Sequence, residues 1–194
     1  MNFAQRWRLV TQQWELPIRQ VREEAAALYA LVADLRPSAM LEVGSAWGGT
    51  LALYAGACAP GARLVSVDNG REAPTLTWTA ARLRGEGFPC DLIVGNSHSL
   101  DTRGQVALAI GVPDFVHIDG DHSAQGVLRD WRDYGRMARI GAIVAFHDIV
   151  PRSPNWGVGI AWPQIRQQAA AYVEIVGRTL PPSNAPAGIG VIWT

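Results

Sequence analysis

The sequence predicts an α/β fold: a mostly parallel, seven-stranded sheet with an antiparallel last strand, lying between two layers of helices. Short apolar runs alternate with longer amphipathic runs, as they do where each strand is followed by a helix. The apolar runs are nearly unbroken, which is typical of parallel strands covered on both faces. Only PPSNAPA separates the last two strand-like runs. It is too short for a crossover, so the final strand is expected to run antiparallel to its neighbour.

The individual elements follow from periodicity and from turn residues. Residues 17–35, PIRQVREEAAALYALVADL, carry apolar side chains at helical spacing. The length suits one well-filled domain, residues 1–194, with residues 1–36 as an N-terminal helical segment packed on it. Strands are expected at 39–44, 63–68, 91–95, 114–119, 141–148, 173–180 and 188–194, and helices at 17–35, 49–59, 73–87, 103–111, 124–138 and 162–172.

The composition excludes several classes of function. The formal net charge is zero, so neither disorder nor a broad electrostatic contact with nucleic acid is expected. The chain contains no lysine, which excludes a P-loop lysine, a Schiff-base lysine and a lysine general base. Cys58 and Cys90 lie among apolar neighbours and are expected in the core.

No apolar run is long enough to cross a bilayer, and the N-terminal residues lack the apolar stretch of a signal peptide. We therefore expect a cytoplasmic protein that acts on a small molecule and has neither a membrane nor a nucleic acid as its partner.

A glycine turn, LEVGSAWGGT, leads from the first strand into a helix. Gly44 and Gly48 allow the backbone to turn sharply and to approach a ligand closely. About 20 residues further on, Asp68 closes the second strand, where an acid accepts hydrogen bonds from ribose hydroxyls. A nucleoside-bearing cofactor is therefore predicted. The spacing E-x-G-x-x-x-G differs from the G-x-G-x-x-G of dinucleotide-binding proteins, which disfavours NAD.

These residues resemble the class I S-adenosylmethionine-dependent methyltransferases, which have a Rossmann-like fold. Their first motif is an acidic residue followed by G-x-x-x-G, and their second strand ends in an acid. The resemblance implies that Glu42 and Gly44 line the methionine end of the cofactor and that Asp68 holds its ribose. The implied cofactor contacts in this stretch are Glu42, Gly44, Ser45, Gly48, Thr50 and Asp68.

Polar residues also follow the third strand. Asn96, Ser97 and His98 offer donors and acceptors suited to the edge of an adenine ring. In metal-dependent catechol-type methyltransferases the matching segment meets the adenine, which implies that role for Ser97 and His98. The alternative is an ordinary turn or helix cap.

Acids and histidines end the fourth and fifth strands, in HIDGDH and FHD. Because neighbouring parallel strands end at the same edge of a sheet, Asp119, His147 and Asp148 are expected to share one divalent cation. Two carboxylates and one imidazole suit Mg²⁺ or Mn²⁺, and the imidazole also allows Zn²⁺ or Fe²⁺. The alternative is that one acid caps a helix while His147 makes a buried hydrogen bond.

The stretches FVHIDGDHSAQGVLRDWRDY and GAIVAFHD resemble a narrower family, the metal-dependent sugar O-methyltransferases of the macrocin and mycinamicin type and the cephalosporin hydroxylase-type proteins. The resemblance covers residues 40–149. It implies that Asp119 binds the metal beside the cofactor and that His122 is the general base, a role that suits an imidazole near neutral pH. Asp121 is assigned to the cofactor's amino group or to a loop tether, and His117 to the core.

The resulting hypothesis is an S-adenosylmethionine-dependent O-methyltransferase, assisted by a divalent metal ion, Mg²⁺ or Mn²⁺, that methylates a hydroxyl of a small molecule such as a sugar or glycosylated natural product. The alternatives are a non-catalytic or accessory S-adenosylmethionine-binding protein and, less favoured, an NAD-dependent oxidoreductase. Trp156 and Trp162 either stack on the acceptor or pack on the sheet or a partner subunit. Trp7 and Trp14 belong to a substrate lid or to a dimer contact, so a homodimer or higher homo-oligomer is an open possibility.

Overall fold

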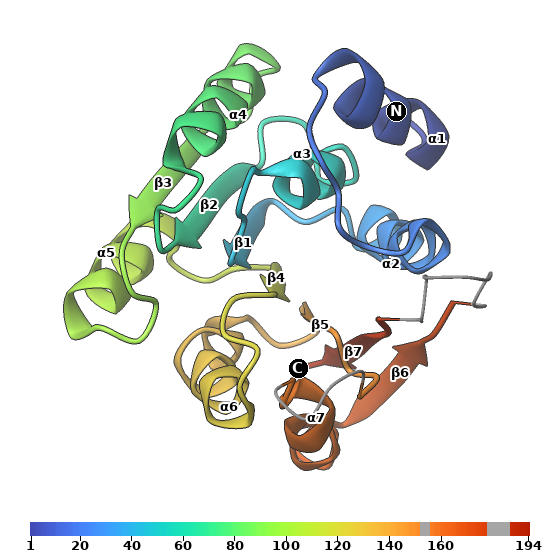
Figure 1. Ribbon diagram of the computed structural model, residues 1–194, viewed down its shortest axis with the longest axis vertical. Helices are drawn as coiled ribbons and strands as arrows, with labels where there is room; N and C mark the ends of the chain where they lie inside the picture. Colours follow the sequence, from blue (N-terminus) through green and yellow to red (C-terminus); the bar gives the residue numbers. More distant parts are fainter. Residues whose placement is uncertain (152–155, 178–186) are drawn as a thin grey trace.

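The computed structural model describes residues 1–151, 156–177 and 187–194. Within these residues seven strands form one sheet in the order β3-β2-β1-β4-β5-β7-β6, and helices cover both of its faces (Figure 1). The strands are β1 (Ala39–Val43), β2 (Arg63–Asp68), β3 (Cys90–Val94), β4 (Phe115–Ile118), β5 (Ile143–His147), β6 (Ala171–Ile175) and β7 (Ile189–Trp193).

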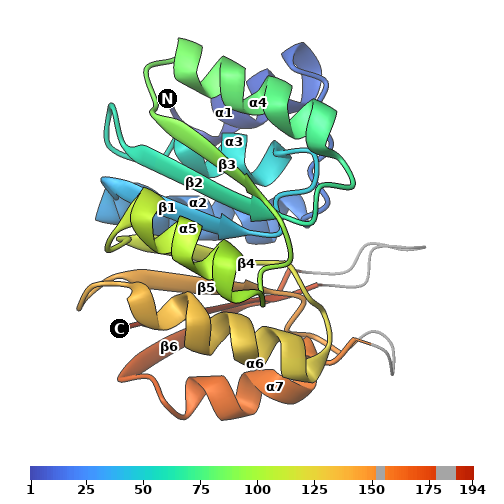
Figure 2. The same cartoon turned by 90° about the vertical axis from the view of Figure 1, so that its left-hand side faces the viewer.

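The helices form the two outer layers. One apolar cluster joins the sheet to α1, α2, α3 and α4, and a second joins it to α5, α6 and α7 (Figure 2). No helix in the described ranges is both long and apolar enough to cross a membrane. The helices are α1 (Phe3–Arg8), α2 (Arg22–Leu35), α3 (Gly49–Ala55), α4 (Ala73–Gly85), α5 (Leu100–Ile110), α6 (Ala124–Asp133) and α7 (Val158–Arg166), with a π-helical segment at Leu9–Gln13 and a 3₁₀ turn at Gly135–Met137.

The predicted topology is confirmed. Strands β1 to β5 pair in parallel, and β7 lies antiparallel between β5 and β6. Val43 of β1 is level with Val67 of β2 and Ile118 of β4, and Ile118 is level with Phe146 of β5. The residues that follow these strands therefore emerge at one edge of the sheet, which is where ligands bind in open α/β folds.

All the predicted helices differ in their bounds from the observed ones, and in two of them the difference changes the structure of a neighbouring segment. The helix expected at 17–35 begins only at Arg22, because residues 15–21 run as an irregular segment across the N-terminal end of α3. The helix expected at 162–172 is α7, which begins at Val158 and has Pro163 inside it. Its predicted last residues, Ala171 and Tyr172, belong instead to β6, where pairing with β7 outweighs helical periodicity. Residues 178–180 of the predicted strand lie outside the described residues.

Candidate functional site

The turn after β1 is tied to the end of β2. Gly44 has a φ of +86°, and a Cβ at this position would overlap the backbone that follows β4, so only glycine fits. The Asp68 carboxylate accepts a hydrogen bond from the Ala46 N–H at 2.9 Å and another from the Gly70 N–H at 2.9 Å. Asp68 therefore holds the turns after β1 and β2 together while its remaining lone pairs stay available to a ligand.

Two adjoining cavities open along this edge of the sheet. The first, of about 500 Å³, lies beside the ends of β4 and β5, and we call it the cluster cavity. The second, of about 840 Å³, lies beside the ends of β2 and β3, and we call it the β2–β3 cavity. The residues that line both cavities are Arg19, Gly44, Ala46, Trp47 and Asp119.

Most of the predicted cofactor residues lie along these cavities. Gly44 and Asp119 line both of them. The predicted residues that line only the cluster cavity are Ser45 and Thr50, and those that line only the β2–β3 cavity are Asp68, Ser97 and His98. The arrangement suits an elongated ligand that extends from the end of β3 to the end of β4.

Glu42 and Gly48, the other two predicted cofactor residues, line neither cavity. Strand alternation turns Glu42 toward the α2 and α3 layer, where its side chain is fully buried and accepts a hydrogen bond from His117 at 2.9 Å. Gly48 is the N-cap of α3 with a φ of +84°, and a Cβ there would lie 2.7 Å from the Thr79 methyl group. Both residues therefore stabilise the turn after β1 through contacts inside the protein.

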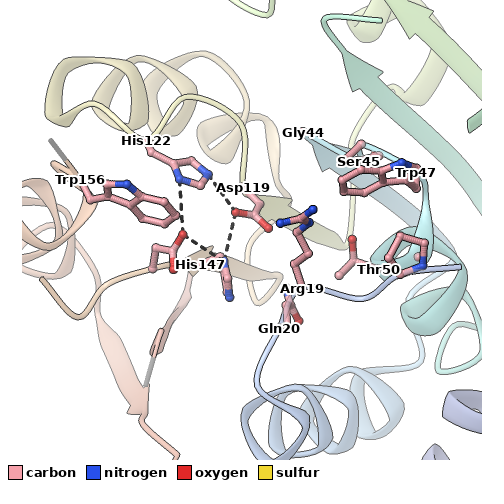
Figure 3. Close-up of a pocket in the computed structure, with 14 residues that line it drawn as sticks. Arg19, Gln20, Gly44, Ser45, Trp47, Thr50, Asp119, His122, His147 and Trp156 are labelled. Carbon is pink, nitrogen blue, oxygen red and sulfur yellow. Dashed lines mark hydrogen bonds and ion pairs between the residues drawn. The ribbon is translucent and has the colours of Figure 1, made fainter. Parts of the chain in front are cut away.

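Two carboxylates and two imidazoles converge in the cluster cavity (Figure 3). His147 Nδ1 lies 3.2 Å from Asp119 Oδ1 and 3.4 Å from Asp148 Oδ2. His122 Nε2 lies 3.3 Å from Asp119 Oδ1, and its Nδ1 lies 3.4 Å from Asp148 Oδ2. Each imidazole therefore faces both carboxylates, and the structure brings the predicted base together with all three predicted metal ligands.

The backbone at the end of β5 directs the side chains of two successive residues, His147 and Asp148, into the cluster cavity. His147 is the last residue of β5, and Asp148 has a φ of +63°, in the left-handed region that non-glycine residues seldom adopt. A strained backbone of this kind is held by its surroundings and is common at functional sites. In His147 the other ring nitrogen, Nε2, is buried and has no hydrogen-bond partner within the described residues.

The charges of the cluster favour an ionised Asp119. Burial alone would raise the pKa of this carboxyl, but the charge of His147 and hydrogen bonds from His122 and His147 outweigh burial, and the pKa lies well below its usual value. Asp119 is therefore a carboxylate at neutral pH, the form that binds a metal ion.

The spacing of the cluster suits a cation. One ligand atom from each of Asp119, His122 and Asp148 lies within 4.8 Å of the others. A cation with ligand distances of roughly 2.0 to 2.2 Å holds its ligand atoms about 3 to 4 Å apart. Imidazole and carboxylate together are a donor set for Mn²⁺, Fe²⁺ or Zn²⁺ as well as Mg²⁺. The residues present therefore fit a divalent metal ion.

Trp156 forms the outer side of the cluster. Its ring contacts His122 edge-to-face with 4.5 Å between ring centroids, and it lines the cluster cavity. The Gly157 N–H donates a hydrogen bond of 2.7 Å to the His122 carbonyl, which ties the start of α7 to the turn after β4. Trp162, the other tryptophan of this region, is buried against Phe146 and Tyr172, so its role is in packing.

A second acid–histidine group stands at the far end of the β2–β3 cavity. His98 Nε2 lies 3.1 Å from Asp130 Oδ1, and the Ser97 hydroxyl donates to the same oxygen at 3.2 Å. Asp130 belongs to α6 and is fully buried, and Tyr134 of the next turn donates to the Ser97 carbonyl. The Ser97–His98 segment is therefore positioned by α6.

Sequence reasoning missed the contribution of residues 15–21. Pro17, Arg19 and Gln20 line the cluster cavity, but helical periodicity with a proline at the start indicated an ordinary first helical turn. It also missed Trp47, which lies inside the glycine turn. Nor did the sequence show that Asp130, on the helix after HIDGDH, would be the buried partner of His98.

Comparisons with known proteins agree with this fold. Residues 41–149 match a family described as "Methyltransferase domain". No curated protein matches the chain. The O-methyltransferase TomG from Streptomyces achromogenes, solved with S-adenosylmethionine, is similar with a TM-score of 0.72 and 18% identity over 100% of this chain and 90% of TomG. An O-methyltransferase from Bacillus cereus, solved with S-adenosylhomocysteine, has a TM-score of 0.71 and 17% identity over 99% of this chain and 90% of its own.

Proposed function

From the premise that the chain belongs to the methyltransferase-domain family, we propose that it is an S-adenosylmethionine-dependent O-methyltransferase assisted by a divalent cation, with a hydroxyl of a small molecule as acceptor. One observation supports this most: Asp119 lines both cavities. Asp68, an acid placed to bind a ribose, lines the β2–β3 cavity, and the carboxylates and imidazoles suited to a metal ion line the cluster cavity. A methyl donor in one cavity and an oxygen acceptor in the other would meet at that junction.

The cofactor proposal is supported by the chemistry of the β2–β3 cavity. Asp68 stands at the end of β2 with each carboxylate oxygen held by a backbone N–H, so it is oriented to accept hydrogen bonds from vicinal hydroxyls. Ser97 and His98 offer polar atoms further along. The two similar proteins were solved in complex with S-adenosylmethionine and S-adenosylhomocysteine.

The metal proposal is supported by the donor set. We assign Asp119, His147 and Asp148 as ligands, with Mg²⁺ or Mn²⁺ as the ion, because His147 Nδ1 lies 3.2 and 3.4 Å from the two carboxylate oxygens. The spacing of Asp119, His122 and Asp148 makes His122 the alternative imidazole ligand. The second imidazole in the cluster shifts the preference toward Mn²⁺, because Mg²⁺ favours oxygen ligands more strongly.

His122 is the proposed general base. Its side chain is 31% exposed whereas that of His147 is 4% exposed, so His122 can pass a proton to solvent and His147 cannot. Asp119 and Asp148 lie on either side of the His122 ring and would stabilise it once it is protonated. The imidazole thus takes the role that lysine fills in catechol-type enzymes, since this chain has no lysine.

The groups that the protein would bind supply the rest of the chemistry: the sulfonium makes the methyl electrophilic, and a divalent cation acidifies a hydroxyl. The protein's own contribution is alignment and electrostatics. Trp47 and Trp156 line the cluster cavity and offer aromatic faces to a sugar or a polyketide. We therefore propose a sugar or glycosylated natural product as the acceptor.

Calorimetric titration with S-adenosylhomocysteine, with and without Mn²⁺ or Mg²⁺, tests the proposal. We expect a dissociation constant near the micromolar range, roughly −8 kcal/mol. Methyl transfer to a panel of glycosides should then require the metal. An accessory protein would bind S-adenosylhomocysteine without turnover on any hydroxyl acceptor. Binding of NAD instead would contradict the proposal and favour an oxidoreductase.

A further inference from the structure

The segment of residues 15–21 is anchored deep in the protein, and we call it the strap. Gln20 is its anchor, with a side chain that reaches the centre of the sheet. The Tyr54 hydroxyl of α3 donates to Gln20 Oε1 at 2.6 Å, and Gln20 Nε2 lies 2.9 Å from His117 Nε2 of β4. Gln20, Tyr54 and His117 are all buried. The strap is therefore joined by side chains to two elements that are distant in the sequence.

Glu42 fixes the direction of these hydrogen bonds. Its carboxylate lies 2.9 Å from His117 Nδ1, and both side chains are fully buried. A carboxylate accepts, so His117 Nδ1 carries the proton and Nε2 accepts from the Gln20 amide. The Gln20 oxygen is then left for the Tyr54 hydroxyl. All four side chains agree on one arrangement, which holds the strap in one position.

The strap is packed closely as well as hydrogen-bonded. The Pro17 carbonyl lies where a Cβ of Gly49 would be, so the strap lies directly on the first residue of α3. Leu16 is 3% exposed, and its N–H donates to the Val10 carbonyl at 3.0 Å. These contacts make the strap a fixed wall of the cluster cavity, and they disfavour a mobile substrate lid for this part of the N-terminal segment.

Arg19 extends from the strap into the junction of the two cavities. Figure 3 shows its side chain projecting between Asp119 and Trp47. Its guanidinium carbon lies 4.7 Å from the centroid of the Trp47 ring, and Arg19 and Trp47 both line both cavities. Within the described residues no carboxylate lies within 4.0 Å of its guanidinium group. Among the residues that the structure describes, the Arg19 guanidinium thus has no ion-pair partner, and its hydrogen-bond donors remain available to a ligand.

The positive charge of Arg19 at the junction of the two cavities indicates which group of the cofactor it would bind. Of the residues that line both cavities, Arg19 is the cationic one, and the other charged one is Asp119. At neutral pH S-adenosylmethionine carries a sulfonium, an ammonium and a single anion, its α-carboxylate. A planar guanidinium pairs with a carboxylate through two parallel hydrogen bonds.

Resting on the proposed function, we infer that Arg19 binds the α-carboxylate of the cofactor's methionine portion, and that the Gln20 anchor positions it for this contact. The site is thus built partly by a segment outside the glycine turn, and it recognises the amino-acid end of the cofactor separately from the adenosine end.

Two ligands that differ in that end test the inference: S-adenosylhomocysteine, which has the amino acid, and 5′-methylthioadenosine, which lacks it. Both are titrated calorimetrically into the wild-type protein, Arg19→Gln and Arg19→Lys. We expect Arg19→Gln to weaken S-adenosylhomocysteine on the order of 10-fold or more while leaving 5′-methylthioadenosine unchanged. Arg19→Lys, which keeps the charge and loses the fork, should lie between the two.

Arg22→Gln is the matched control. Arg22 is three positions away and also lies near aromatic rings, those of Phe3 and Trp7, but it lines neither cavity. It should leave both affinities unchanged. Equal loss of both ligands in Arg19→Gln, no loss of either, or a defect confined to methyl transfer to an anionic acceptor would overturn the inference. If the wild-type protein binds neither ligand, the proposed function itself fails.

Discussion

Asp119 and Asp130 are both aspartates that face histidines at the same edge of the sheet, yet their surroundings shift them in opposite directions. Asp119 has two imidazoles, at 3.2 and 3.3 Å, and its pKa lies well below the usual value. Asp130 is fully buried, with His98 and Ser97 on one oxygen, the Asp121 backbone as a further hydrogen-bond donor and the Asp121 charge opposing its ionisation. Burial therefore outweighs its hydrogen bonds and raises its pKa to about 6.

The difference shows how an aspartate–histidine pair can have two roles, one in binding a cation and one in holding a neighbouring segment. In the cluster cavity, enough positive partners surround the carboxylate to keep it charged and ready for a cation. Beneath the β2–β3 cavity, a carboxylate with too few partners holds a neighbouring segment in place. Four measurements would break or sharpen this comparison.

The largest effect is expected from Asp119→Asn on metal binding. Removing a charged ligand from the cluster should weaken Mn²⁺ on the order of 100-fold or more, measured by calorimetry or by electron paramagnetic resonance. Asp130→Asn is the matched control, because it makes the same change outside the cluster and should leave Mn²⁺ affinity unchanged. Similar losses in both variants would show that the two regions do not differ as described.

Asp130→Asn should change how stability depends on pH. The pKa of Asp130 is about 6 in the folded protein, above its usual 3.8, so between these values the folded state binds more protons and stability falls as pH rises. Relative to the variant, the wild-type protein should lose about 2 to 3 kcal/mol between pH 4 and pH 6. Urea unfolding across that window measures the difference, and a constant difference would contradict the raised pKa.

Alanine substitutions of His147 and His122 should differ in their effects on Mn²⁺ binding and on methyl transfer. His147→Ala should weaken Mn²⁺ on the order of 10-fold, because it removes a buried ligand. His122→Ala should retain most Mn²⁺ and S-adenosylhomocysteine affinity and lose most methyl transfer, as expected for a general base. If His122→Ala loses Mn²⁺ to the same extent, His122 is a ligand and the base must be sought elsewhere.

The smallest effect is expected from Ser97→Ala. The Ser97 hydroxyl donates to Asp130 at 3.2 Å, and its removal should destabilise the protein by about 1 kcal/mol in urea unfolding. In the Asp130→Asn background the same substitution should cost less, because the charged acceptor is already gone. Equal costs in both backgrounds would mean that the two side chains are not coupled.

Much of the site could be predicted because parallel strands end at one edge. Asp68 ends β2, and Asp119 and Asp148 follow β4 and β5, so their placement at one edge of the sheet required only the topology. The burial of the Glu42 side chain away from the cavities could have been deduced from strand alternation, because Glu42 precedes the last residue of β1 and faces away from the turn.

The sequence by itself determined the alternation of strands and helices, the glycine turn and the chemistry available at each strand end, because these depend on local periodicity and on residue types. Only the tertiary structure decided that Gln20 meets His117, that Arg19 stands between the cavities and that Asp130 lies buried under His98. These contacts join residues far apart in the chain. These contacts form only when the helical layers pack on the sheet. The periodicity of the local sequence predicts helices and strands but does not predict which distant residues will meet.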